Sequence, residues 1–339
     1  MHPPSKLRTH GGSRRNRVTG AALAVTAFAA CFFGAGTPSA SAATAASPDD
    51  AMPELVVTGE RAGPGLWHVQ RGSAQLWILG TVAPLPKEMT WRSRQVERIL
   101  GDSTAVLVAK PFQVGIVRLL WLMVTKRDLL MLPGGRKLKD VLPPERYARF
   151  AAQRARFTSS ADKWERFRPI VAMALLEEAA LRRVGLSTRL DVAAEVRKLA
   201  RKHDVPVEEV KLAGLGDALD ILKTLPPDTE GKCAAAVLAT VETGLPRLVA
   251  RAQAWATGDV ARIRSLPEGP EVGACRAAVG GGGGATELLG QIRRAWLAAM
   301  EERLRRGGST LAVVGMDLLI EPGGLLDELR ARGYRVDGP

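Results

Sequence analysis

Residues 76–86 read LWILGTVAPLP and residues 310–319 read TLAVVGMDLL. Each segment is a short apolar run that ends at a glycine, Gly80 in the first and Gly315 in the second, which is the pattern of a buried β-strand that turns sharply at its end. In α/β proteins, sites are built at such strand ends. The two segments stand near opposite ends of the chain, so we expect both ends to enter one sheet with the two glycine turns side by side.

The chain between these segments has mainly helical patterns, with apolar residues three to four positions apart in residues 146–157, 170–184, 189–203, 234–257 and 286–306. Further strands are expected at residues 66–69, 104–108 and 334–336, with a turn at residues 71–73. The predicted fold class is α/β (α+β): a central sheet of N- and C-terminal strands with a large, mainly helical insertion at about residues 144–306. We expect residues 63–339 to form a single domain.

Residues 1–42 have the pattern of a signal peptide. A basic start without acidic residues precedes an apolar run at residues 18–36, and residues 40–42 (ASA) fit a small-x-small cleavage site. An uncleaved membrane anchor is the alternative, although the run is short for a bilayer span. Arg14 and Arg15 leave the export route, general or twin-arginine, open. Lipidation at Cys31 is the alternative to release, and we expect a periplasmic or secreted protein.

The mature chain is moderately basic, because removing the five positive charges of the signal from +13 leaves +8. Its basic residues are spread over helices rather than interleaved with aromatic residues, so we expect no nucleic-acid partner. Residues 43–62 read as a flexible lead-in. The apolar run at residues 114–124 contains Arg118 and is too short for a transmembrane helix. We expect no membrane span after signal removal, with a membrane-surface helix as the alternative for that run.

The cysteine count agrees with export. Cys233 and Cys275 are the two cysteines that remain after signal removal. An even pair in an oxidising compartment favours one disulfide, and two buried thiols are the alternative.

Several short motifs follow one another in a recognisable order. Their sequences are GTVA at residues 80–83, FRP at 167–169, AWATGD at 254–259, GMDL at 315–318 and PGGLL at 322–326, followed by RGYRV at 332–336. Order and spacing together resemble the TraB/GumN family, relatives of the TIKI metalloproteases, over about residues 66–336. The segments PGLW at 64–67 and MTWRSR at 89–94 are similar to those of a branch that lacks histidines.

The resemblance implies a site from which the metal ligands have been lost. Active relatives use two Gly-x-x-His histidines, helped by acidic residues, to hold a divalent metal that activates water. At the matching positions this chain has Ala83 and Leu318 in place of the histidines. The family's glutamate after the third strand falls near Ala109, and its later glutamate falls near Lys211. We therefore expect no metal, no cofactor and no catalytic residue, with these four positions vestigial.

The histidine count supports the loss, because only His68 and His203 remain after signal removal, and both read as ordinary partly exposed residues. A carboxylate site for magnesium, calcium or manganese is the alternative. Its candidate ligands are Asp317 and Glu321 beside the second motif, and Glu88 and Glu97 after the first.

The sequence thus predicts an exported, catalytically inactive protein that retains a cleft between the two glycine turns for an envelope peptide or glycan. The cleft candidates are Gly80, Thr81, Arg293, Gly315 and Asp317. One alternative is a peptidase-like metal-dependent hydrolase that uses carboxylates near Asp317. The other is a structural or assembly protein of the cell envelope.

Overall fold

The computed structural model describes residues 64–87, 94–110, 125–159, 164–188, 190–212, 215–266, 269–280 and 284–339. The predictions for the signal peptide (1–42, with Cys31), the lead-in (43–62) and the apolar run at 114–124 lie outside the described residues.

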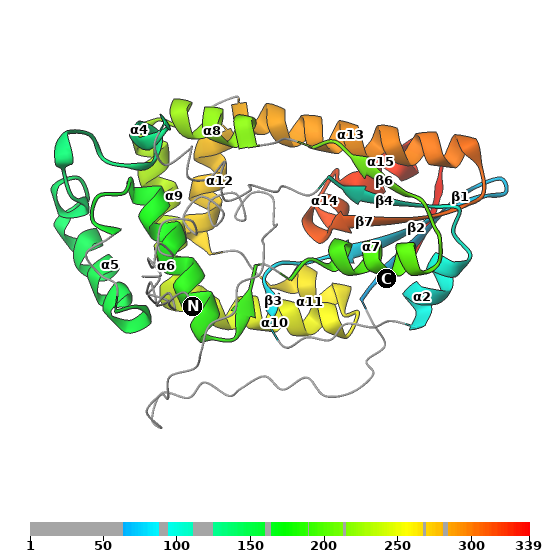
Figure 1. The fold of residues 1–339 in the computed structure, drawn as a ribbon, viewed down its shortest axis with the longest axis horizontal. Helices are drawn as coiled ribbons and strands as arrows, with labels where there is room; N and C mark the ends of the chain where they lie inside the picture. The colour runs from blue at the N-terminus through cyan, green and yellow to red at the C-terminus, as the bar shows by residue number, and fades with distance from the viewer. Residues whose placement is uncertain are drawn as a thin grey trace, which may run out of the picture.

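A six-stranded sheet forms one end of the molecule (Figure 1). In spatial order its strands are β6 (Val207–Val210), β4 (Ala105–Ala109), β7 (Ser309–Gly315), β2 (Ala74–Thr81), β1 (Leu66–Arg71) and β8 (Arg335–Asp337). The first four are mutually parallel, whereas β1 runs antiparallel to both β2 and β8. The central sheet of N- and C-terminal strands is confirmed.

The central strands are buried on both faces, which explains their nearly continuous apolar sequences. β7 is the clearest case, because residues 310–314 are all buried. The β1–β2 hairpin has a two-residue loop, since Arg71 pairs with Ala74. Gly72 in that loop has a φ of 60°, a left-handed conformation that glycine adopts without steric cost.

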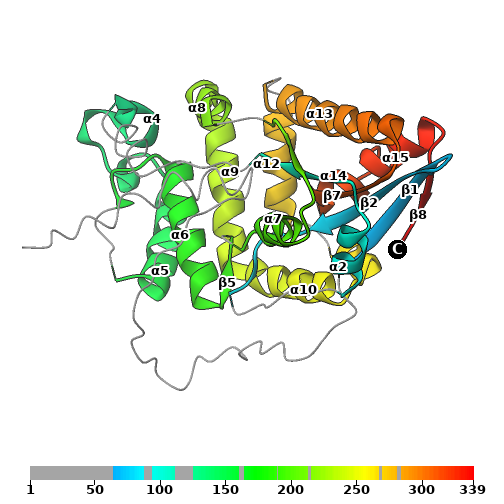
Figure 2. The same cartoon turned by 45° about the vertical axis from the view of Figure 1, so that its right-hand side comes forward.

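Helices cover both faces of the sheet (Figures 1 and 2). α13 (Gly284–Arg306) and α15 (Leu325–Ala331) lie over one face, and α2 (Arg94–Gly101) and α7 (Val192–Lys202) lie over the other. The short α14 (Met316–Ile320) follows β7 directly. Apolar side chains of these helices, such as Val96, Leu325 and Leu329, are buried in the core.

The middle of the chain forms a helical body beside the sheet (Figure 2). Its main helices are α5 (Pro144–Phe157), α6 (Pro169–Arg183), α9 (Pro227–Ala239), α10 (Leu245–Ala256) and α12 (Pro270–Gly280). Smaller elements are α4 (Arg127–Leu130), η2 (Pro133–Gly135), η3 (Leu138–Asp140), α8 (Leu215–Thr224), α11 (Val260–Ser265) and the pair β3 (Leu85–Pro86) with β5 (Leu186–Ser187). The helical character of the insertion is confirmed, with β6 as the segment that returns to the main sheet.

Covalent and ionic crosslinks stabilise the helical body. The predicted disulfide is confirmed: Cys233 of α9 is bonded to Cys275 of α12. Arg168, the N-cap of α6, forms a largely buried ion pair with Glu230 of α9, with Nε 3.1 Å from Oε2. These contacts fix the position of α9 in the helical body.

A second buried ion pair joins Arg154 of α5 to Glu165. The Tyr147 hydroxyl donates to Glu165 Oε1 at 3.1 Å. Burial, with the neighbouring carboxylate, raises the pKa of the Tyr147 phenol.

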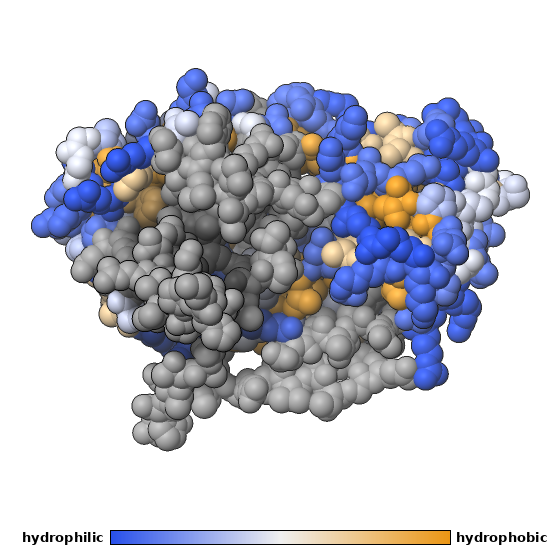
Figure 3. Space-filling model, in the orientation of Figure 1, coloured by the Kyte–Doolittle hydropathy of each residue, from blue (hydrophilic) through white to orange (hydrophobic). Residues whose placement is uncertain are grey.

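α9, the π-helical turn η5 (Thr240–Gly244) and α10 form one 30-residue helix, which within the described residues is long and apolar enough to cross a membrane. This similarity to a membrane-spanning helix rests on length and composition only, and a helix packed in a protein core can have the same length and composition. Among the described residues, Leu289 is a large hydrophobic residue whose side chain is exposed to solvent. The described surface is mainly hydrophilic on the face seen in Figure 3.

Candidate functional site

The carboxyl ends of four neighbouring parallel strands define the candidate site. In β2 and β7, Thr81 pairs with Gly315, so the two glycine turns lie side by side as the sequence predicts. β4 follows on the other side of β7, and Ala109 at its end pairs with Val210 at the end of β6. We call this border, marked by Thr81, Gly315, Ala109 and Lys211, the strand-end edge.

All four positions that the resemblance identified fall at this edge. Ala83 lies two residues beyond β2, and Ala109 is the last residue of β4. Lys211 directly follows β6, and Leu318 lies in α14, three residues beyond β7. Segments that are more than 200 residues apart in the sequence therefore meet at one edge, as is typical of sites in α/β sheets.

Gly80 is required by packing. A Cβ atom at this position would lie 2.8 Å from Met316 Cε and 2.8 Å from Trp67 Cζ3, and both side chains are buried. The Gly80 carbonyl accepts a 2.7 Å hydrogen bond from Trp255 Nε1. Next to it, Thr81 Oγ1 donates to the Val314 carbonyl at 3.2 Å. The first turn is thus held by α10, α14 and β7 together.

The turn at Gly315 is different. Gly315 is exposed, and a Cβ there would have no described atom within 4 Å. Its φ of −59° and ψ of 131° are accessible to any residue. Packing therefore explains the glycine of the first motif but not that of the second, because no described residue covers Gly315.

The acidic residues beside the second motif are paired with arginines. Asp317, which is exposed, forms an ion pair with Arg251 of α10. Glu321 Oε1 accepts a 2.8 Å hydrogen bond from Arg293 Nη2 of α13, and Arg293 Nη1 donates to the Gly323 carbonyl at 3.1 Å. Asp317 is therefore paired with Arg251 and Arg293 with Glu321, and no contact among the described residues joins Arg293 to Asp317.

The comparison with family models decides the relationship, because the chain matches the TraB/PrgY/gumN family over residues 65–338. The protein belongs to this family. Neither the curated proteins nor the solved structures contain a match.

The strand-end edge of this TraB/PrgY/gumN protein has a donor set that does not suit a divalent metal. Ala83 and Leu318 offer hydrocarbon, and Lys211 offers a cation. Metal binding needs deprotonated carboxylates, thiolates or neutral imidazoles. Within the part of the chain that the structure describes, no three His, Cys, Asp or Glu side chains gather as potential metal ligands.

The remaining candidate ligands do not complete a site. Glu97 lies half-buried on α2, and Glu88 lies outside the described residues. His68 is on β1, stacked on Trp77, and His203 is the exposed C-cap of α7. These two histidines therefore lie on β1 and at the end of α7, away from the two glycine turns.

Basic side chains are a feature of this edge that the sequence analysis missed. Lys110 and Lys211 follow neighbouring strands, are exposed, and have no side-chain partner among the described residues. Arg197 of α7 donates to the Ala109 carbonyl at 2.5 Å and lies 3.6 Å from Asp191. The pairing of β6 with β4 brings the lysines together, and no local pattern in the sequence reveals that pairing.

Proposed function

We propose that this protein is an exported, catalytically inactive member of the TraB/PrgY/gumN family that binds an envelope peptide or glycan at the strand-end edge. The observation that carries the proposal is the identity of four side chains at adjoining strand ends. Ala83, Ala109, Lys211 and Leu318 stand where a metal-dependent hydrolase needs ligands and acidic helpers.

The electrostatics support loss of the metal. Asp317 and Glu321 each face a guanidinium, so coordination of a cation would require each carboxylate to leave its arginine. Lys110 and Lys211 already make this edge positively charged, and a bound cation would increase that charge further. Like charges repel at short range, so this edge disfavours a divalent cation.

The same electrostatics favour a ligand that carries negative charge. Two exposed lysines at neighbouring strand ends, with no described atom within 4 Å of a Cβ built at Gly315, suit a carboxylate of a peptide or of an acidic sugar. Such a ligand would use the edge for binding without requiring activated water.

Metal analysis of the purified protein tests the loss of hydrolysis. After incubation with zinc or manganese and dialysis, we expect no stoichiometric metal in the wild-type protein. The double variant A83H/L318H places imidazoles after the paired strands β2 and β7, and we expect it to take up more metal than the wild type, whereas A83H alone serves as the matched control. Stoichiometric metal in the wild type that is lost in Asp317→Ala would support the carboxylate hydrolase and overturn the proposal.

Two further measurements test export and binding. N-terminal sequencing of the protein recovered outside the cytoplasm should start at Ala43; retention in the cytoplasm with Met1 intact would contradict export. Binding of acidic peptides or acidic oligosaccharides should weaken in a Lys110→Ala/Lys211→Ala variant, because both lysine charges are removed. Unchanged affinity would place the ligand elsewhere.

A further inference from the structure

A second candidate site lies at the opposite end of the same strands. An open hollow of about 560 Å³ is bounded by the beginning of β2 and β7 and by α2. Gln75 and Ser309 on its floor form the first pair of the β2–β7 ladder, whereas Thr81 and Gly315 at the strand-end edge form the last. Six residues of strand separate the two places, or roughly 20 Å. We call this feature the Trp77 hollow.

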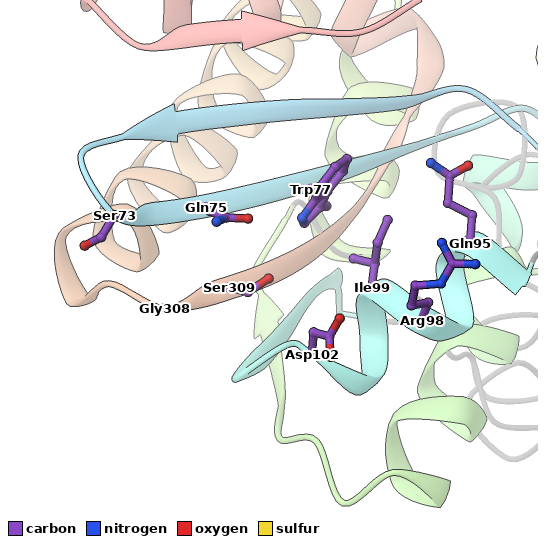
Figure 4. Close-up of a pocket in the computed structure, with 9 residues that line it drawn as sticks. All are labelled: Ser73, Gln75, Trp77, Gln95, Arg98, Ile99, Asp102, Gly308 and Ser309. Atoms are coloured by element: carbon purple, nitrogen blue, oxygen red, sulfur yellow. The ribbon is translucent and has the colours of Figure 1, made fainter.

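The Trp77 hollow contains a fixed aromatic surface. Trp77 projects from β2 between the strand residues Gln75 and Ser309 on one side and Ile99 of α2 on the other (Figure 4). One face of its indole is stacked on His68, with ring centroids 4.0 Å apart and an angle of 10° between the planes. Gln70 Nε2 hydrogen-bonds His68 Nδ1 at 2.9 Å, which holds the stack in place. The half-buried indole is thus held rigidly in the hollow.

Polar side chains with unused hydrogen-bonding capacity surround the indole. Gln75, Gln95, Arg98 and Asp102 are exposed, and none of the four side chains has a hydrogen bond or ion pair with a described residue. Arg98 and Asp102 are four positions apart, a spacing at which opposite charges commonly pair, yet they remain separate. The hollow therefore offers donors and acceptors together, with one positive and one negative charge.

We propose that the Trp77 hollow binds a saccharide, with one sugar ring against the indole and its hydroxyl groups bonded to the surrounding polar side chains. A pyranose has a flat face of C–H groups, which suits an aromatic surface, and a rim of hydroxyls that both donate and accept. Gln75, Gln95, Arg98 and Asp102 match such a rim, because amides do both, the guanidinium donates and the carboxylate accepts. The volume lies within the range of small-molecule sites.

Other ligand classes fit less well. An extended peptide cannot add to β2 as a strand, because β1 and β7 already pair with it on both sides. A polyphosphate chain or nucleic acid needs a surplus of positive charge, whereas Arg98 and Asp102 cancel one another. A lipid chain needs a long apolar channel, whereas the large apolar side chains among the described residues of this lining are Trp77 and Ile99 alone. The mixture of one aromatic ring with neutral amides and balanced charges favours a sugar.

Isothermal titration calorimetry tests the proposal. The full purified protein is titrated with a panel of soluble oligosaccharides built from neutral hexoses, N-acetylhexosamines and hexuronic acids. We expect at least one panel member to bind, and Gln75→Ala and Asp102→Asn each to weaken it by about threefold to tenfold, equivalent to one lost hydrogen bond. Both side chains are exposed and have no partner among the described residues, so these variants should fold normally. Trp77→Ala should remove binding, with circular dichroism as the check on its folding.

Two matched variants make the result specific. Asp228→Asn makes the same chemical change on an exposed residue of α9 and should leave binding unchanged. Lys211→Ala alters the strand-end edge, so a saccharide that responds to Lys211→Ala but not to Gln75→Ala would belong to that edge and overturn this proposal while supporting the proposed function. Absence of binding across the panel, or binding that Gln75→Ala and Asp102→Asn leave unchanged, would also overturn it.

Discussion

Replacement of Gly80 by alanine should destabilise the protein, because the space for a side chain is already filled. The added Cβ would lie 2.8 Å from Met316 Cε, 3.0 Å from Met316 Sδ and 2.8 Å from Trp67 Cζ3. Trp67 and Met316 are each only 1 % exposed, so neither can move into solvent without opening the core. Met316 is flexible enough to move slightly, whereas the ring of Trp67 is rigid and stays close.

The expected cost follows from overpacking. Added methyl groups in well-packed cores typically cost about 1–3 kcal/mol. Loss of glycine's freedom in the unfolded chain returns about 0.4–1 kcal/mol. We therefore expect Gly80→Ala to lower the free energy of unfolding by about 1–2 kcal/mol, measured by urea denaturation followed by circular dichroism.

Gly315→Ala is the matched control, since the same change at the second motif meets no described atom within 4 Å. We expect it to change the free energy of unfolding by less than about 1 kcal/mol in either direction. In a Met316→Ala background the cost of Gly80→Ala should fall by at least about 0.5 kcal/mol, because residues in direct contact are energetically coupled. If Gly80→Ala were as harmless as Gly315→Ala, the packing explanation of the first motif would be refuted.

Three further predictions concern the helical body. The Cys233–Cys275 disulfide joins residues that are 42 positions apart in the sequence. Its reduction should lower the free energy of unfolding by about 4 kcal/mol, from the loop entropy that the unfolded chain regains. Identical urea midpoints with and without reductant, or two free thiols in the untreated protein, would contradict this. Arg168→Ala should lower the free energy of unfolding by about 3–5 kcal/mol, because it leaves Glu230 buried without its partner. Lys198→Ala, which breaks an exposed ion pair, should lower it by about 1 kcal/mol or less. Equal losses in the two variants would contradict a stabilising role of the buried pair. The raised pKa of Tyr147 lets the native state keep a proton that the unfolded chain releases. The contribution of Tyr147 to stability is therefore complete below about pH 10 and declines as the pH rises further. Urea titrations across this range should show a steeper decline in the wild type than in Tyr147→Phe, and parallel pH profiles would disprove it.

The sequence was most informative where local pattern and burial agree. The apolar runs of β2 and β7 predicted buried strands, because strands covered on both faces need apolar side chains at every position. β6 was missed for the opposite reason: it is an edge strand with the sequence VEEV, which reads as polar. Its Glu208 is paired with Arg303 of α13, a partner 95 residues away. No short-range pattern reports such a pairing.

The candidate site shows the same division. The chemical groups of the site were visible in the sequence, since Ala83 and Leu318 cannot ligate a metal and only two histidines, His68 and His203, follow residue 42. Its surroundings were not visible: the Trp255–Gly80 hydrogen bond spans 175 residues, and the Arg251–Asp317 ion pair spans 66. The Trp77 hollow also depends on where α2 lies against the strands, which residue spacing within α2 or β2 does not specify.

Side-chain chemistry and hydrophobic periodicity are local properties, so the order of amino acids specifies which chemical groups are available and which segments are apolar enough to be buried. Which of these groups come into contact depends on the packing of the folded chain. Strand order placed Lys110 and Lys211 after neighbouring strands, at the same edge of the sheet as the two glycine turns, and helix packing gave Asp317 and Glu321 their arginines. These contacts depend on the whole core, since hydrophobic burial is non-directional and selects positions only through packing and hydrogen bonding across the complete fold.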